Sequence, residues 1–149
     1  MKKKITLLTL CAMLFALCSF AQAQQAGKVP SIGFLDNSTA AGSAGLLEVF
    51  WQEMRKLGWI EGKNITIEYR FAEQKLERLP ELAAELVRLK VDLIVVSGGT
   101  TPLAAKGATS TIPIVMTSSV DPVAEGLIAS LARPGGNITG NFEFSARTN

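Results

Sequence analysis

The stretch VDLIVVSGGTTP, residues 91–102, is the part of the 149-residue sequence that decides the fold. Its first half, 91–96, is a nearly continuous β-branched run, which is typical of a central strand buried on both faces. Its second half is a polar, glycine-containing loop that ends in Thr101 and Pro102, residues that commonly begin a helix. A buried strand that passes through such a loop into a helix is the unit from which parallel α/β sheets are built.

Strand and helix patterns alternate on both sides of this unit. Apolar runs and period-two alternation predict strands at 29–35, 65–71, 91–96 and 112–116. Apolar residues at spacings of three and four predict helices at 46–57, 75–90, 102–109 and 126–132. The segment 36–45 contains only small and polar residues and is predicted to be a loop. The order βαβαβαβα predicts an open, parallel α/β sheet with right-handed crossovers and helices on both faces.

Two of the predicted elements carry further detail. The alternation along 65–71 indicates a strand that is covered on one side, at an edge of the sheet. Pro80 is expected in the first turn of the helix at 75–90, where its missing N–H costs nothing. Gly58 is expected to end the helix at 46–57.

The first 23 residues have the three-part layout of a secretory signal. Three lysines at positions 2–4 precede the uncharged apolar segment 5–20, and Ala21-Gln22-Ala23 supplies small residues at both positions that a signal peptidase reads. A membrane anchor is the alternative, but the apolar run is shorter than the roughly 20 residues that a spanning helix needs. We therefore expect cleavage after Ala23 and a periplasmic location for the mature chain.

The composition of the mature chain excludes several classes of site. Both cysteines, Cys11 and Cys18, lie in the signal segment, and the sequence contains no histidine. A thiol nucleophile, a Ser-His-Asp triad and a Cys/His metal site are therefore excluded, and we expect no metal and no cofactor. The formal net charge is +2 and becomes −1 without the three lysines of the signal, so no basic patch indicates a nucleic-acid partner.

Polar loops follow three of the predicted strands, at the edge where open parallel sheets bind their ligands. Glycines there let the backbone approach a ligand, and the free N–H groups at the start of the helix after Thr100 suit a carboxylate or another small anion. The candidate ligand-binding residues are Asn37, Ser38, Ser97, Gly98, Gly99, Thr100, Thr117, Ser118, Ser119 and Asp121. The alternative is that these loops are ordinary strand-to-helix turns, which need the same residue types.

Several segments together carry a resemblance to a known family. In chain order they are residues 57–65 (LGWIEGKNI), 67–70 (IEYR), 79–87, 108–115, 121–123 and 131–140. They resemble the ABC-transporter substrate-binding proteins related to tryptophan-binding lipoproteins, a type I periplasmic binding protein class. The resemblance implies two Rossmann-like α/β lobes with a small molecule, possibly an amino acid, bound between them. It also implies delivery of this ligand to an ABC permease in the inner membrane.

The resemblance covers residues 24–140 and implies that they are the N-terminal, ligand-binding lobe. It makes 137–140 the segment that crosses toward a second lobe, and residues 141–149 depart from the family pattern. The chain is therefore expected to be one lobe of a truncated receptor and not an enzyme. The alternative is an exported α/β enzyme, in which only a carboxylate such as Asp36 or Asp121 could serve as acid or base.

Overall fold

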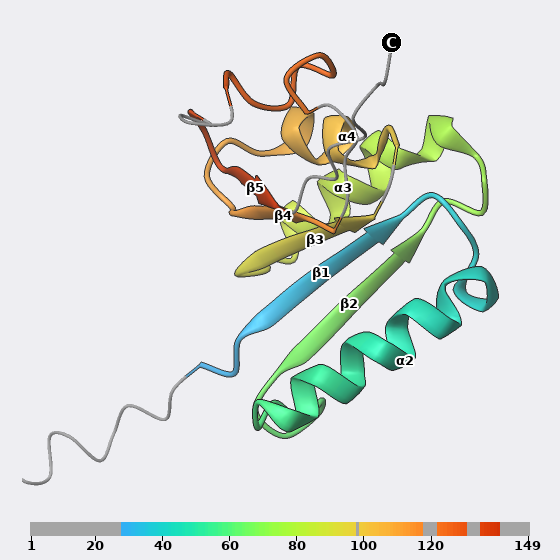
Figure 1. Cartoon of the computed structure of the whole chain (residues 1–149), viewed down its shortest axis with the longest axis vertical. Helices are drawn as coiled ribbons and strands as arrows, with labels where there is room; N and C mark the ends of the chain where they lie inside the picture. The colour runs from blue at the N-terminus through green and yellow to red at the C-terminus, as the bar shows by residue number, and fades with distance from the viewer. Residues whose placement is uncertain (1–27, 98, 118–121, 131–134, 141–149) are drawn as a thin grey trace, which may run out of the picture.

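The computed structural model describes residues 28–97, 99–117, 122–130 and 135–140. They form a five-stranded parallel sheet of order β2-β1-β3-β4-β5, with helices packed on it (Figure 1). The strands are β1 (Ser31–Asp36), β2 (Thr66–Phe71), β3 (Leu93–Ser97), β4 (Ile114–Met116) and β5 (Ile138–Gly140). The helices are α2 (Ala40–Lys56), the single 3₁₀ turn η1 (Leu76–Arg78), α3 (Leu79–Arg88) and α4 (Thr101–Ala108).

The parallel sheet that the sequence predicts is confirmed. β3 lies in the middle of the sheet, and its residues Ile94, Val95 and Val96 are buried, as expected for a β-branched run. β2 lies at an edge, as its alternating pattern predicts. β1 pairs with β2 on one side and with β3 on the other, and this register sets Asp36 beside Ser97 at the carboxyl end of the sheet.

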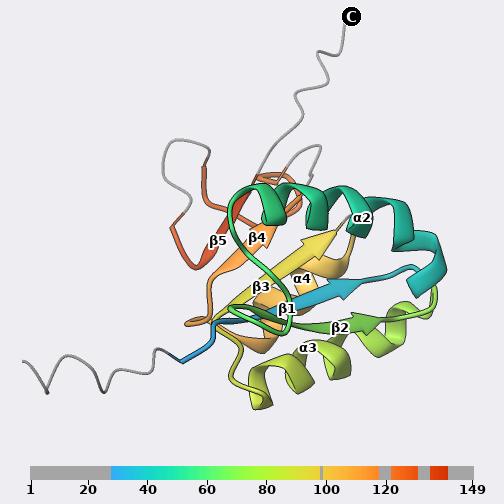
Figure 2. The ribbon, with the colours of Figure 1, turned by 90° about the horizontal axis from the view of Figure 1, so that it is seen from below.

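Helices cover both faces of the sheet, which also confirms the prediction (Figures 1 and 2). Because successive residues of a strand point to opposite faces, the apolar core divides into two clusters. On one face α3 and α4 bury Leu86 and Ala105 against the sheet. On the other face α2 packs Phe50 and Met54 against it. Pro80 lies in the first turn of α3, as predicted, although the helix expected at 75–90 is divided into η1 and α3.

The prediction of a loop over 36–45 is wrong for its second half, because α2 begins at Ala40. Thr39 is the N-cap residue, and its side-chain oxygen accepts a hydrogen bond from the Gly42 N–H at 3.1 Å. This bond satisfies one of the free donors of the first turn and stabilises the start of the helix. The early start also brings Ser43 onto the buried side of α2, against the end of β1.

The helix predicted at 126–132 is not found in its described part, residues 126–130. Residues 122–126 form a turn in which the Gly126 N–H donates to the Val123 carbonyl oxygen at 3.0 Å. Gly126 has a φ of +70°, which a residue with a side chain rarely adopts and which ends any helical path at this point. The remaining residues of the predicted helix, 131–132, lie outside the described part of the chain.

β5 is a strand that the sequence analysis did not predict, since residues 137–140 are interpreted there as a crossover. Its three residues pair in parallel with β4, from Ile114 beside Ile138 to Met116 beside Gly140. Asn137 fixes the start of the strand, because its Nδ2 donates to the carbonyl oxygens of Thr109 at 3.1 Å and Ile112 at 2.7 Å.

The predicted signal, 1–23, and the divergent tail, 141–149, lie outside the described residues. None of the helices in the described part combines the length and the apolar character that crossing a membrane requires. Export and cleavage after Ala23 remain predictions.

Candidate ligand-binding site

The sheet order creates a switch point between β1 and β3. From β1 the chain moves to β2 on one side and then returns to β3 on the other, so the connections that follow β1 and β3 diverge. Open α/β sheets of this strand order bind ligands in the crevice at this point, outside the carboxyl ends of the strands. Asp36 and Ser97 are register partners there, and the loops that follow them are the centre of the candidate site.

The loop after β1 is held by the carboxylate of Asp36, which is only 5% exposed. This carboxylate accepts hydrogen bonds from the Ser38 N–H at 2.9 Å and from Ser43 Oγ at 2.7 Å. Ser38 Oγ in turn lies 2.6 Å from Ser43 Oγ. The predicted ligand residue Ser38 therefore uses its hydroxyl within the protein, whereas the half-exposed side chain of Asn37 makes no hydrogen bond to the described residues.

A second loop, after β2, supports the first one. The N–H of Gln74 donates to the Asn37 carbonyl oxygen at 2.7 Å, and the N–H of Glu73 donates to the Ser38 carbonyl oxygen at 3.0 Å. Glu73 and Gln74 have φ values of 54° and 63°, a left-handed conformation that non-glycine residues adopt at a cost. The sequence analysis did not predict these contacts to the loop after β1, because neither glutamate nor glutamine is typical of a left-handed turn.

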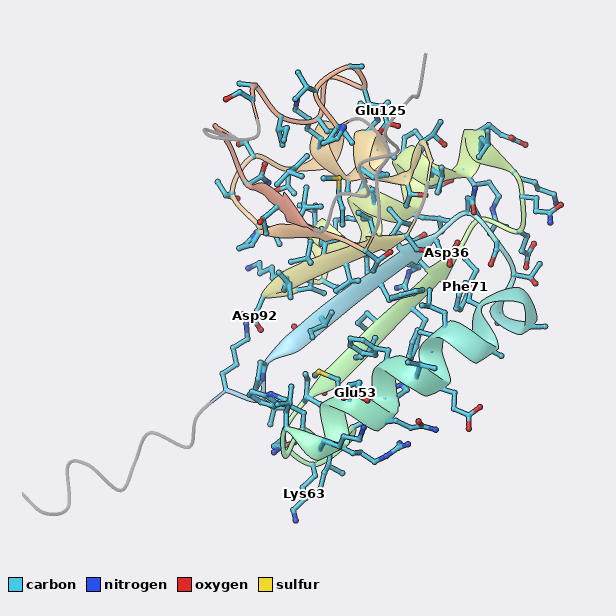
Figure 3. All side chains as sticks on the ribbon, viewed as in Figure 1. Asp36, Glu53, Lys63, Phe71, Asp92 and Glu125 are labelled. Atoms are coloured by element: carbon cyan, nitrogen blue, oxygen red, sulfur yellow. The ribbon has the colours of Figure 1, made fainter. Side chains whose placement is uncertain are left out.

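Phe71 is the last residue of β2 and the register partner of Asp36, so the two residues lie near each other at the carboxyl end of the sheet (Figure 3). Its half-buried ring stacks on Tyr69 with 6.2 Å between the ring centroids and an interplanar angle of 6°. Phe71 thus provides a rigid aromatic wall beside the switch point. The sequence carried a signal for it, since Phe71 is the last residue of a predicted strand.

The start of α4 is the part of the site with the most unused hydrogen-bonding capacity. Thr100, the N-cap residue, makes no side-chain capping bond, so the first N–H groups of the helix keep no such partner. Thr101 is fully buried, and its Oγ1 finds no hydrogen-bond acceptor or donor among the described residues. A buried hydroxyl in that condition costs about 1–3 kcal/mol. Thr101 was not among the predicted ligand residues, although Thr100 was.

The structure brings six of the predicted residues to the same edge of the sheet. They are Asn37, Ser38, Ser97, Gly99, Thr100 and Thr117, which follow or end the three neighbouring strands β1, β3 and β4. The predicted residues Gly98, Ser118, Ser119 and Asp121 lie outside the described part of the chain. The ligand contacts of all ten remain predictions.

Neither metal chemistry nor a carboxylate base is supported by the described residues. They contain no group of three or more His, Cys, Asp or Glu side chains that could hold a metal ion. Asp36, one of the two carboxylates named for the enzyme alternative, is nearly inaccessible, and both of its oxygens accept hydrogen bonds. Its geometry is that of a group that holds a loop in place.

Comparison with known proteins decides the family. The sequence model of the ABC transporter substrate binding protein family matches residues 37–146, which is most of the chain. The chain belongs to this family. The resemblance found in the sequence is therefore confirmed. This family member is also 36% identical, over 95 residues, to a tyrosine-binding protein of Clostridioides difficile strain R20291; the matched segment is 64% of this chain and 28% of that relative.

Solved structures share the fold. A ligand-free, open substrate-binding protein with adhesive properties from Clostridium difficile matches with a TM-score of 0.73 and 30% identity, over 80% of this chain and 40% of that one. A conserved domain protein from Vibrio cholerae matches with a TM-score of 0.73 and 28% identity, over 80% of this chain and 40% of that one. An ABC domain from Streptococcus pneumonia in complex with L-Trp has a TM-score of 0.70 and 22% identity, over 77% of this chain and 39% of that one. This family member thus spans less than half the length of these relatives.

Proposed function

We propose that this chain is the exported solute-binding component of an ABC import system, and that the carboxyl edge of its sheet binds an amino acid or a similar small molecule. Family membership supports a binding role, and the 36% identical relative is named for binding tyrosine. The predicted signal at 1–23 supports a periplasmic location. The partner that would receive the ligand is an ABC permease in the inner membrane.

The observation that carries the proposal is the start of α4. Its first N–H groups lack a side-chain cap, and the buried Thr101 hydroxyl beside them lacks a partner among the described residues. A ligand carboxylate at this point would accept charge-assisted hydrogen bonds from these N–H groups, each contributing about 1.5–3 kcal/mol, whereas the Thr101 hydroxyl is buried beneath them. Asn37 and Ser97 add amide and hydroxyl groups across the switch point, and Phe71 offers an apolar wall to the ligand side chain.

We also propose that the chain on its own binds weakly. It spans 40% of the length of two solved relatives that are 28% and 30% identical to it over the matched segment, and a two-lobed receptor would contact the ligand from both sides. Losing three to five contacts of about 1 kcal/mol each would weaken binding by roughly two to four orders of magnitude. The test must therefore detect millimolar affinity.

The test is a titration of the isotope-labelled chain followed by amide NMR shifts. The ligands are L-tyrosine, L-tryptophan and L-phenylalanine, with the corresponding amides as controls that lack the carboxylate. We expect the free amino acids, and not the amides, to move the amide signals of Gly99, Thr100 and Thr101. Thr100→Asp should weaken this response, because its own carboxylate would cap the same N–H groups, whereas Thr66→Val, on an exposed position of β2, should leave it intact.

Two results would contradict the proposal. One is a chain whose amides at the start of α4 respond to none of the twenty amino acids. The other is an equal response to an amino acid and to its amide, since the carboxylate would then play no part in recognition.

A further inference from the structure

The turn after β2 contains the most strained backbone of the described residues. Glu73, Gln74 and Lys90 are the non-glycine residues with a left-handed conformation in the described part, at φ values of 54°, 63° and 56°. The first two are adjacent, whereas residues with a side chain normally adopt this conformation singly. Such a conformation persists where the surrounding contacts hold it, so the contacts of this turn indicate what it serves.

These contacts lead to the loop after β1. The backbone N–H groups of residues 72–74 donate to the carbonyl oxygens of Asp36, Ser38 and Asn37, at 2.9, 3.0 and 2.7 Å respectively. The shortest of the three bonds therefore comes from Gln74. Because three consecutive carbonyl groups are bonded to one turn, a change in the backbone of the turn would release the whole loop.

The peptide group between Asn37 and Ser38 is fixed at both of its polar atoms. Its carbonyl oxygen accepts the bond from Gln74, and its N–H donates to the carboxylate of Asp36 at 2.9 Å. A peptide group is planar, so these two bonds fix the backbone on the C-terminal side of Asn37. The side chain of Asn37 has no hydrogen bond to the described residues, and its direction therefore depends on this backbone.

We propose that Gln74 is a positioning residue for the ligand site, because its left-handed backbone holds the Asn37–Ser38 peptide group and thereby aims the Asn37 side chain at the ligand. The inference rests on the proposed function, in which Asn37 meets an amino acid. Gln74 acts through its backbone, since its side chain is exposed and has no hydrogen bond to the described residues. The carboxylate of Glu73 lies 3.0 Å from Arg78, so position 74 is the cleaner one to substitute.

The left-handed form of the turn is close to balance with other conformations. Each of the three backbone bonds contributes a modest net free energy, and two adjacent left-handed residues oppose them. A residue that disfavours this conformation lowers the fraction of chains in which Asn37 is in place. The apparent affinity then falls by the same factor. Valine, which is β-branched, disfavours the left-handed conformation strongly, whereas asparagine and glycine adopt it readily.

The experiment places valine, asparagine and glycine in turn at position 74 and titrates each variant with L-phenylalanine. The NMR signals of the Gly99 and Thr100 amides report binding, and circular dichroism verifies folding. Gln74→Val should weaken binding by about three- to tenfold, whereas Gln74→Asn and Gln74→Gly should bind at least as tightly as the wild type. The matched control is Lys90→Val. Lys90 is also left-handed and exposed but lies before β3, away from the site, so the affinity should change by less than about 1.5-fold.

A second measurement needs no ligand. It is the hydrogen exchange of the Ser38 amide, which opens when the loop after β1 loses its contacts. Gln74→Val should speed this exchange by about three- to tenfold, and Lys90→Val should not. If Gln74→Val does not fold, Gln74→Gly decides the question, since it should slow the exchange relative to the wild type. If no amino acid moves the signals of the wild type, the proposed function fails, and this exchange still decides the role of Gln74.

Three results would overturn the proposal. Equal effects of valine at positions 74 and 90, on affinity or on exchange, would assign the turn to overall stability alone. Weaker binding by Gln74→Gly would show that the Gln74 side chain itself contacts the ligand. An exchange rate of the Ser38 amide that does not follow the residue at position 74 would show that the turn does not hold the loop.

Discussion

Ser43→Ala tests whether the carboxylate of Asp36 organises the loop at the end of β1. The substitution removes the 2.7 Å hydrogen bond that Ser43 Oγ donates to this buried carboxylate. A hydrogen bond to a charged group contributes about 1.5–3 kcal/mol. Ser38 Oγ keeps an alternative acceptor, the Thr39 carbonyl oxygen at 3.1 Å, so its loss of Ser43 adds little. Alanine exceeds serine in helix propensity by at most about 0.5 kcal/mol, which offsets only part of the loss.

The expected net effect is a decrease of about 1–2.5 kcal/mol in the free energy of unfolding. Urea unfolding measures it, and with a slope of about 1–2 kcal/mol per molar the midpoint should fall by roughly 1 M. Ser110→Ala is the control, because Ser110 is exposed and outside any helix, and it should stay within about 0.5 kcal/mol of the wild type. A Ser43→Ala midpoint equal to that of Ser110→Ala would refute the role assigned to Asp36.

Three further predictions concern single groups. Thr101→Val should raise the free energy of unfolding of the ligand-free chain by about 1–3 kcal/mol, because it removes a buried hydroxyl without a partner; a destabilised variant would show that this hydroxyl is already bonded. Tyr69 is the only tyrosine in the chain, and burial raises its pKa above 10.0, although the hydrogen bond from Trp51 acts in the opposite direction. Its contribution to stability should therefore be complete below pH 10.0 and be lost as the pH rises through the raised pKa. Because there is no other tyrosine, the pH titration of tyrosinate absorbance measures the pKa of Tyr69 directly, and Trp51→Phe should raise this pKa further. A titration midpoint at or below 10.0 in the wild type would contradict the prediction. The hydrogen bond from Lys28, followed by that from the Ser31 N–H, lowers the pKa of Asp92 below 3.8, so its contribution is complete above pH 3.8 and is lost as the pH falls through the lower value. The difference in urea midpoint between wild type and Asp92→Asn should therefore shrink from pH 6 to pH 2.5, and an unchanged difference would show that the charge of Asp92 is irrelevant.

The sheet could be predicted from the sequence because its main signals are local. The β-branched run at 91–96 and the alternation at 65–71 assign the central and edge strands without any tertiary information. The start of α2 could not be predicted, since Gly42 and Ser43 are poor helix formers and only the N-cap bond of Thr39 shows where the helix begins. β5 is three residues long, too short for a period to be visible.

The location of the candidate site followed from topology, but the roles of its residues did not. The carboxyl edge of a parallel sheet is known once the order of elements is known. Which hydroxyl is free there depends on neighbours that are distant in sequence: Ser38 is engaged by Ser43, five residues away, whereas Thr101 is buried without a partner in the described structure. The support that Glu73 and Gln74 give to the loop after β1 arises from backbone contacts, which carry no signature in residue type.

α2 connects the apolar packing on one face of the sheet with the loop at the carboxyl end of β1. At its first turns Ser43 bonds to Asp36 and thereby fixes the loop that carries Asn37. In its second half Phe50 and Met54 pack against the apolar cluster on the sheet. A helix packed by one apolar stripe moves as a rigid body when its packing changes, because its backbone hydrogen bonds are closed within the helix. The packing of Phe50 and Met54 on the sheet therefore also holds Ser43 against Asp36, so the order of the loop that carries Asn37 depends on both ends of α2.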